Sequence, residues 1–209
     1  MQDIKMQWSL IHIPKTGATG LEKDTMKCGI HGGGHKNTEK VLEKKYKVFV
    51  IIRDPVDRMF SQFYYWKQGS SSSQYRRSEF QITEHNKIYP NLTSFIFSLQ
   101  HGSVLARAII NTNMGFTWSD HFAQQMKWLD GTHENTYLIC YDKNTLSERV
   151  NDFFQHFNIN CTMKNSIVNP TKVHMYETLP LDQERWIRKR YSEDFSLWDK
   201  CKGRDFVKF

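Results

Sequence analysis

A short apolar segment that runs directly into a helix-start signal constrains the fold of this chain more than any other feature. Residues Tyr46 to Ile52 end in Val-Phe-Val-Ile-Ile, which is apolar at every position. A strand that is apolar on both faces is typical of a parallel sheet covered on both sides. Asp54 and Pro55 follow at once, and Asp at the N-cap with Pro at the first helical position favours the start of a helix. We therefore expect an α/β protein with a central parallel β-sheet flanked by helices.

The rest of the chain continues this alternation of strands and helices. Further strands are predicted at Trp8 to Ile13 and at Tyr137 to Cys140, and a surface loop is predicted at Gln68 to Arg77. Because no repeat or linker divides the 209 residues, a single domain over residues 1–209 is expected. The predicted helices are Leu21 to Thr25, Asn37 to Lys45, Asp54 to about Lys67, Asn91 to Gln100, Trp118 to Leu129, Asn144 to His156 and Leu181 to Tyr191.

The first predicted strand leads into the segment His12-Ile13-Pro14-Lys15-Thr16-Gly17-Ala18-Thr19-Gly20. Small residues there expose main-chain N–H groups, and a following helix adds partial positive charge at its N-terminus. Lys15 contributes a full charge, and the hydroxyls of Thr16 and Thr19 can donate hydrogen bonds. The lysine precedes the glycine, so this is not a Walker A loop. The composition fits a phosphate or sulfate cradle and an ordinary strand–turn–helix connection equally well.

A second motif follows the central strand, with Arg53 at its carboxyl end and Ser61 in the second turn of the next helix. Ligands of open α/β sheets bind at this edge. An arginine fork combined with a hydroxyl suits a phosphate monoester, and Arg58 lies close by in the sequence. The alternative is that Arg53 pairs with a neighbouring carboxylate such as Asp57.

In this order, the two motifs resemble those of the PAPS-dependent sulfotransferases, most closely the carbohydrate branch that includes the heparan sulfate 2-O- and 6-O-sulfotransferases. In that family a loop similar to HIPKTGGT contacts the 5′-phosphosulfate, and here Ala18 replaces one glycine. A motif similar to RDPxxRxxS holds the 3′-phosphate. Weaker similarity at Tyr137 to Asp142, at Val168 to Lys172 and at Ile187 to Trp198 extends the resemblance from about Leu10 to Trp198. The donor-binding residues that it implies are Pro14, Lys15, Thr16, Gly17, Ala18, Thr19, Arg53, Arg58, Ser61, Thr171 and Lys172.

The resemblance implies a single-domain, P-loop-like enzyme that transfers the sulfuryl group of PAPS to an acceptor hydroxyl, which we expect to be on a carbohydrate. PAP is then the product, and no metal is needed because lysine and arginine supply the positive charge. A histidine between the motifs would be the base. His31 and His35 both qualify, and Gly34-His35 before a helix favours His35. Lys15 would neutralise charge on the bridging oxygen.

Three alternatives remain at this point. Either histidine can be an exposed loop residue. The chain can also be a catalytically inactive PAP- or glycan-binding module, which would keep Arg53 and Ser61 and lose the base. A nucleotide-kinase-like phosphotransferase would require a Walker A loop and acidic Mg²⁺ ligands.

The net charge, the hydropathy and the cysteine content bear on the partners and the cellular compartment of this protein. The net charge of +7 favours anionic partners, but the basic residues are scattered, which argues against nucleic acid. No apolar run of about 18 residues exists, so no integral membrane segment is expected. Because Met1 to Gln7 is polar, a cytoplasmic protein is expected if the chain is complete, and a Golgi-lumen protein if it is a trimmed ectodomain. The four cysteines form no CxxC pair, and Cys140, within an apolar run, is predicted to be a buried core thiol.

Overall fold

The computed structural model describes residues 7–32, 46–68, 87–111, 122–129, 135–164 and 178–209. They form two compact units. The first unit contains Met1–Asp54, Gln124–Asn169 and Glu193–Phe209, and the second contains Pro55–Ala123 and Pro170–Ser192. The expectation of one domain over the whole chain stays a prediction.

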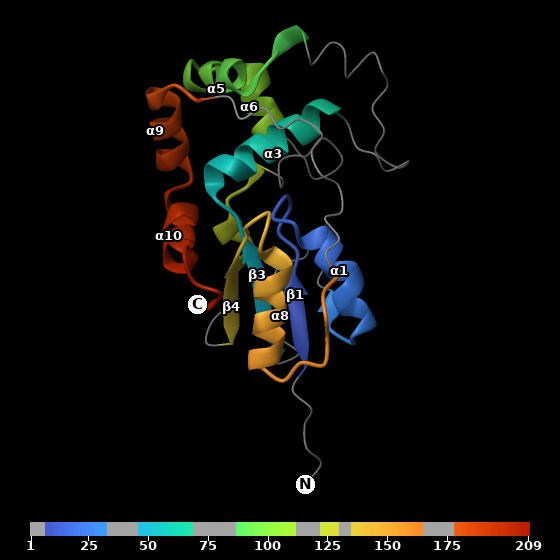
Figure 1. Ribbon diagram of the computed structural model, residues 1–209. Helices are drawn as coiled ribbons and strands as arrows, with labels where there is room; N and C mark the ends of the chain where they lie inside the picture. Colours follow the sequence, from blue (N-terminus) through green and yellow to red (C-terminus); the bar gives the residue numbers. More distant parts are fainter. Residues whose placement is uncertain (1–6, 33–45, 69–86, 112–121, 130–134, 165–177) are drawn as a thin grey trace. The chain divides into compact units, whose positions relative to one another are not determined.

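A five-stranded sheet, in the order β2-β1-β3-β4-β5, forms the centre of the first unit. The four strands β1 (Trp8–Ile11), β2 (His31–Gly32), β3 (Lys47–Ile52) and β4 (Thr136–Cys140) are parallel, and β1, β3 and β4 point the same way in Figure 1. The short edge strand β5 (Val207–Lys208) pairs antiparallel with β4. The predicted α/β class is confirmed, with a mostly parallel sheet rather than a wholly parallel one.

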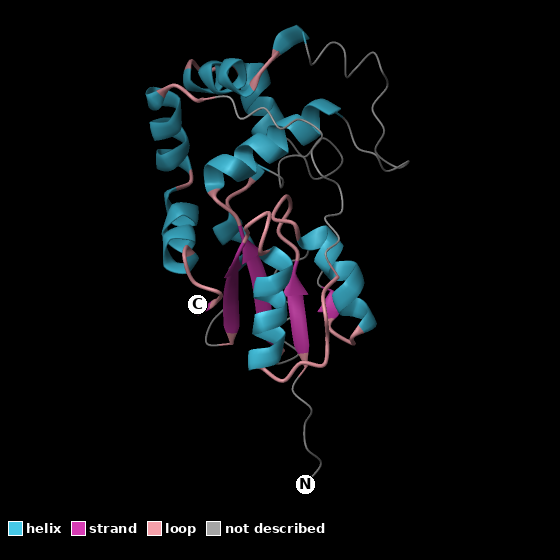
Figure 2. Ribbon diagram, viewed as in Figure 1, coloured by secondary structure: helices cyan, strands magenta, loops and turns pink. Residues whose placement is uncertain are grey.

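Helices cover both faces of this sheet because its central strand is apolar on both. Phe49 and Ile51 of β3 pack on the side of α1 (Ala18–Lys27) and α8 (Leu146–His156). Val48, Val50 and Ile52 face the other way, towards the 3₁₀-helix η2 (Gln125–Leu129) and α10 (Ser192–Cys201). Figure 2 shows α8 in front of the sheet, with its axis roughly along the strands. The alternation is the one expected for a fully covered strand.

Several boundaries differ from those predicted. β1 ends at Ile11 rather than Ile13, and α1 starts at Ala18, before the predicted Leu21. His31–Gly32 was not predicted as a strand, but it forms β2 because its main chain pairs in parallel with Ser9 and Leu10 of β1. The predicted helix at 37–45 lies outside the described residues.

The α-helix predicted at Trp118 to Leu129 is wrong at its end, although Phe122 is helical. Residues Gln125–Leu129 form a 3₁₀-helix instead. Its start is fixed by the buried carboxylate of Asp194, which accepts hydrogen bonds from the main-chain N–H groups of Gln125 at 2.8 Å and Met126 at 2.9 Å. A contact from a distant part of the chain therefore decides where this turn begins.

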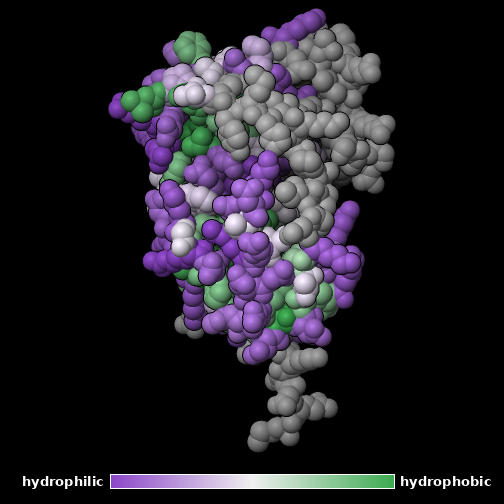
Figure 3. Space-filling view, viewed as in Figure 1, coloured by the Kyte–Doolittle hydropathy of each residue, from purple (hydrophilic) through white to green (hydrophobic). Residues whose placement is uncertain are grey.

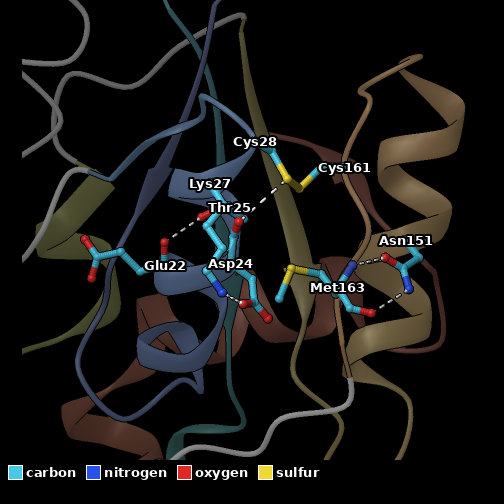
Figure 4. The surroundings of a disulfide bond; sticks show 8 residues. All are labelled: Glu22, Asp24, Thr25, Lys27, Cys28, Asn151, Cys161 and Met163. Carbon is cyan, nitrogen blue, oxygen red and sulfur yellow. Dashed lines mark hydrogen bonds and ion pairs between the residues drawn. A yellow bond between two sulfur atoms is a disulfide. The ribbon is translucent and has the colours of Figure 1, made fainter.

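Two disulfides link segments of the first unit. Cys140 at the end of β4 is buried as predicted, but it is not a thiol, because it bonds to Cys201 at the end of α10. Cys28 bonds to Cys161 and ties the end of α1 to the segment after α8, as Figure 4 shows. In the same segment, Asn151 of α8 accepts from the N–H of Met163 at 2.7 Å. Both bridges close long stretches of chain, which restricts the unfolded state.

The second unit consists of helices in its described part. They are α3 (Pro55–Gln68), α5 (Leu92–Gln100), α6 (Val104–Asn111) and α9 (Leu181–Arg190). The predicted start of α3 at Pro55 is confirmed. Phe95 is the centre of the core, with ring centroids 5.4 Å from Phe63, 5.1 Å from Tyr89 and 5.8 Å from Phe122.

The exposed surface is mixed in character. Figure 3 shows hydrophilic side chains over most of the visible described surface, with some hydrophobic side chains in the region of α5 and α9. Among the described residues, no helix has the length and hydrophobicity to cross a bilayer. Among the described residues of the second unit, the large exposed apolar side chains are those of Ile88, Phe97, Val104, Leu105 and Leu181.

Candidate functional site

The order of the strands points to one edge of the sheet in the first unit. From β1 the chain passes through α1 to β2 on one side, whereas β3 pairs with β1 on the other side. The carboxyl ends of β1 and β3 are therefore the point where the direction of the connections reverses. In open α/β sheets, ligands bind in the crevice at such a point. The segment after β1 and Arg53 after β3 both lie at these strand ends.

The segment after β1 makes a tight, partly left-handed turn. Lys15 has a φ of 66° and Gly17 a φ of 87°. A side chain larger than hydrogen at such a φ carries strain of about 1 kcal/mol or more, so Lys15 must be held there by its surroundings. Thr16 is buried, and its hydroxyl donates to the carbonyl of Ile13 at 2.9 Å. Because that proton is used within the turn, Thr16 would meet an anion through its main-chain N–H.

Arg53 holds this turn from the neighbouring strand. Its Nη1 donates to the carbonyl oxygen of Lys15 at 2.9 Å. The guanidinium also lies over the ring of Tyr141, with Cζ 4.5 Å from the ring centroid. Such stacking favours a planar cation over an ammonium group. The structure thus brings the first and second motifs into contact through Lys15 and Arg53, whereas the predicted role of Arg53 at a 3′-phosphate stays a prediction.

The main chain of Arg53 is in turn fixed by the side chain of Gln125. The Gln125 amide accepts from the Arg53 N–H at 2.9 Å and donates to the Arg53 carbonyl at 2.8 Å. Gln125 is itself buried, and its own N–H donates to Asp194. A series of hydrogen bonds therefore runs from Asp194 through Gln125 and Arg53 to Lys15.

The side chain of Lys15 has an unusual electrostatic environment. Its pKa is lowered to about 7 from the ordinary 10.5, first because burial penalises the ammonium and second because the positive charge of Arg53 is near. A bound anion would oppose both effects, because it solvates the ammonium and offsets the charge of Arg53. The site therefore favours an anion over a neutral ligand.

Glycine is required at position 17 by packing as well as by φ. A Cβ there would lie 2.8 Å from Cε2 of Tyr141 and 3.1 Å from Cδ2 of Leu146. Tyr141 therefore supports both halves of the site, since its ring carries the Arg53 guanidinium and abuts Gly17. The Lys15–Gly17 turn, Arg53, Tyr141 and Gln125 together are called the cradle below.

The other predicted residues of the first motif flank the cradle. Pro14 is buried before the turn, Ala18 is buried at the start of α1, and Thr19 is exposed in its first turn. Arg58 and Ser61 lie on α3 in the second unit, where both are buried. Arg58 donates to the carbonyl of Ala123 at 2.8 Å and lines a small pocket with Pro55, Met59, Gln62, Phe122 and Tyr191. Their predicted role at a 3′-phosphate stays a prediction.

Of the two candidate bases, His31 lies within the described residues and His35 does not. His31 pairs in register with Ser9 of β1, and its ring stacks on Tyr46, which precedes β3, with centroids 5.6 Å apart. Its ring therefore lies towards the amino ends of the strands rather than at the cradle. His35, Thr171 and Lys172 lie outside the described residues.

Sequence reasoning missed several residues of this region. Gln125, Asp194 and the pair His12 and Glu22 were not recognised, and Tyr141 was noted only as part of a strand. Gln125 and Asp194 carry no local signal, because their partners are 72 and 69 residues away. The spacing of Thr19 and Glu22 on one face of α1 was a signal that could have been used.

Comparisons of the chain with protein-family models, with curated proteins and with solved structures found no match. The class of this protein is therefore described from its fold and from the cradle alone. It is an α/β protein with a cationic site at the carboxyl ends of β1 and β3.

Proposed function

We propose that this protein is a PAPS-dependent sulfotransferase, which transfers a sulfuryl group to a hydroxyl of an acceptor, in our view a carbohydrate. The observation that carries the proposal is the hydrogen bond from Arg53 to the carbonyl of Lys15 across the two strand ends. It joins the two motifs whose order first indicated this function. The lowered pKa of Lys15, which follows first from burial and second from Arg53, is a further reason to expect an anion there.

In the proposed reaction, the acceptor oxygen attacks sulfur while the bond between sulfur and the 5′-phosphate oxygen breaks. R–OH and PAPS give R–OSO₃⁻, PAP and a proton. Lys15 and the N–H groups of its turn would stabilise charge on the departing phosphate. The rigid support of the turn by Arg53 suits this role, because preorganised donors need no rearrangement during the reaction.

The proton of the acceptor requires a base. The location of His31 towards the amino ends of the strands favours His35, so we assign the role to His35 in this proposal. The two disulfides hint at an extracytoplasmic setting, because such bonds persist mainly in oxidising compartments. A Golgi-lumen enzyme is accordingly the version of the proposal that we favour.

PAP binding provides the first test. PAP should raise the melting temperature, and Arg53→Ala should remove most of that rise because it releases the Lys15 turn. Arg204→Ala is the matched control, since Arg204 is an exposed arginine of the same unit. No shift with PAP at low salt would show that the donor assignment is wrong.

Turnover is tested with ³⁵S-labelled PAPS and a panel of hydroxyl-bearing acceptors, with glycans first. His35→Ala should abolish transfer and leave the PAP shift intact, whereas His31→Ala should retain transfer. PAP binding without transfer to any acceptor would instead identify an inactive binding module. Unchanged transfer in His35→Ala would place the base elsewhere.

A further inference from the structure

The described part of the second unit exposes several large apolar side chains to solvent. Of the six large hydrophobic side chains that are exposed among the described residues of the chain, five belong to this unit. Val104 is 83% exposed, Leu181 62% and Phe97 54%. A single exposed apolar side chain needs no explanation, whereas a contiguous group of them marks an interaction site. The group is called the apolar surface below, and its members are Ile88, Phe97, Val104, Leu105 and Leu181.

Hydrogen bonds between α5 and α9 bring two members of the apolar surface together. The Gln100 amide of α5 donates to the carbonyl and to the carboxylate of Asp182 in α9, both at 3.4 Å. A second amide, that of Gln183 in α9, donates to the main chain of α5 at 3.0 Å. Phe97 lies three residues before Gln100 on the same face of α5. Leu181, which precedes Asp182, is therefore beside Phe97, and Figure 3 shows hydrophobic side chains in this region.

The turn from α5 to α6 supplies the other members. α6 starts at Val104, after a turn of three residues that follows α5. The hydroxyl of Tyr89 lies 3.4 Å from Oγ of Ser103, the last residue of this turn. Because Ile88 precedes Tyr89 and Val104 follows Ser103, both exposed side chains lie near the turn. The apolar surface therefore follows the end of α5, the start of α6 and the start of α9, three helices that lie together in Figure 1.

The charge of the segment that carries most of this surface is positive. Residues 87–111 contain no aspartate or glutamate. Their cations Lys87 and Arg107 are both exposed. Lys87 adjoins Ile88, and Arg107 reaches the turn between α5 and α6, since a Cβ on Gly102 would lie 3.3 Å from its Nη2. Cations therefore border the apolar side chains of this segment.

α9 repeats the combination on one of its faces. Arg185 and Lys189 are exposed, four and eight residues after Leu181, so the three side chains share a face of the helix. The acids of α9 are Asp182, which accepts the amide hydrogen bond described above, and Glu184, which forms an ion pair within the helix. An apolar tip followed by two cations is the result.

We propose that the apolar surface docks this protein onto the surface of a lipid bilayer with anionic headgroups. The apolar side chains enter the boundary between headgroups and acyl chains, and the neighbouring cations contact lipid phosphates and carboxylates. No residue of the cradle takes part, so the inference goes beyond the proposed sulfotransferase activity and does not depend on it.

A lipid surface fits this combination better than a second protein does. Phenylalanine and leucine with lysine and arginine beside them are typical of helices that lie in a membrane interface. The long side chains of Arg185 and Lys189 can extend to the headgroups while Leu181 enters the apolar layer. Protein–protein interfaces are by contrast depleted in lysine. A second copy of the chain would bring the same cations to the contact, and residues 87–111 offer no acid to pair with them.

Co-sedimentation of the whole protein with lipid vesicles tests the proposal. The probe is a vesicle of phosphatidylcholine with about 30% phosphatidylserine, and the comparison is a vesicle of phosphatidylcholine alone. At about 0.1 M salt the protein should bind the anionic vesicle at least about ten-fold more tightly, and at about 0.5 M salt this preference should shrink. Absence of binding to the anionic vesicle, or equal binding to both vesicles, overturns the proposal.

Substitutions at the apolar side chains locate the binding. Val104→Asp and Leu181→Asp should each weaken vesicle binding about ten-fold or more, because an apolar side chain leaves the interface and a negative charge enters it. Both residues are exposed and start a helix, where aspartate is favourable, so the melting temperature should not fall. Met26→Asp is the matched control, since Met26 is an apolar residue of the first unit with 60% exposure. Wild-type binding by Val104→Asp and Leu181→Asp, or an equal loss in Met26→Asp, overturns the proposal.

A second pair of variants tests the cations. Arg185→Gln combined with Lys189→Gln should lower binding to the anionic vesicle about ten-fold and leave binding to phosphatidylcholine unchanged. Lys23→Gln combined with Lys202→Gln removes the same charge from exposed residues of the first unit and should bind as the wild type does. An equal loss in both double variants would mean that net charge alone drives the binding, which contradicts the proposal.

Analytical ultracentrifugation without lipid tests the alternative that a second copy covers the apolar surface. A dimer that forms with rising protein concentration and is lost in Val104→Asp would assign the surface to self-association and overturn membrane docking. A monomer that binds anionic vesicles supports docking. PAP binding should be the same in all these variants, so this result is independent of the test of the proposed function.

Discussion

Raising the pH from about 6 to about 8 should weaken sulfate binding to the cradle through the deprotonation of Lys15. The pKa of Lys15 is lowered to about 7 because burial penalises the ammonium and because Arg53 is near. Sulfate is doubly charged throughout this range, so its own titration does not intervene. PAP would be a poorer probe, since its phosphate monoesters titrate near pH 6.

The size of the effect follows from the fraction of charged Lys15. With a pKa of about 7, roughly nine tenths of the free protein carries the ammonium at about pH 6 and roughly one tenth at about pH 8. A bound anion favours the ammonium form, so we take Lys15 to be charged at both pH values in the complex. The dissociation constant should therefore rise about ten-fold, which is about 1.4 kcal/mol.

Titrations by nuclear magnetic resonance at constant ionic strength measure this change, and the Lys15→Arg variant isolates it. Arginine stays protonated, so the variant should lack the Lys15 share of the pH dependence. Lys23→Arg, at an exposed lysine on α1, should keep the full dependence. Equal pH dependence in wild type and Lys15→Arg would refute the reasoning.

The remaining predictions concern the supports of the cradle. Gly17→Ala should lower the free energy of unfolding by about 2–4 kcal/mol and abolish sulfate binding. Gly29→Ala, at a residue with a similar φ and open space around it, should lower the free energy of unfolding by only about 1 kcal/mol. Urea unfolding measures the two changes in stability. Gln125→Ala should cost about 2–3 kcal/mol and weaken PAP binding, because two hydrogen bonds to the main chain of Arg53 are lost; unchanged calorimetric affinity for PAP would contradict this. Mild reductant should open Cys28–Cys161 in the native protein before the buried second bridge, since Cys28 is exposed, and alkylation with peptide mass analysis would show the order.

Local signals predicted the parts of the fold that depend on neighbouring residues. The apolar run before Arg53 predicted a covered strand that ends at Ile52, and Asp54-Pro55 predicted a helix that starts at Pro55. Both are as expected because the strand pattern and the helix-start signal are properties of a few consecutive residues. The position of Lys15 and Arg53 at neighbouring strand ends also followed, since parallel strands place their carboxyl ends together.

The errors arise where a partner distant in sequence decides the structure. The end of the segment predicted as a helix to Leu129, Gln125–Leu129, is a 3₁₀-helix because Asp194 accepts hydrogen bonds from its first N–H groups. Cys140 was predicted to be a thiol because nothing near it marks Cys201, 61 residues on, as a neighbour. In both cases the sequence shows which residue types are present but not which residues contact each other. Asp194 meets the N–H groups of Gln125 and Met126, and Cys140 meets Cys201, only once the sheet and α10 have formed.

The cradle depends on the same long-range order, and this has a consequence for its chemistry. Lys15 is held in a left-handed conformation by Arg53, which is fixed by Gln125, which is anchored by Asp194. A left-handed lysine is unfavourable in an isolated loop, so the turn takes this shape only after the first unit has folded. The strain is then borne by the folded unit before any ligand arrives. An anion should accordingly bind without rearrangement of the main chain, which is the condition under which hydrogen-bond donors and charges stabilise a transition state most effectively.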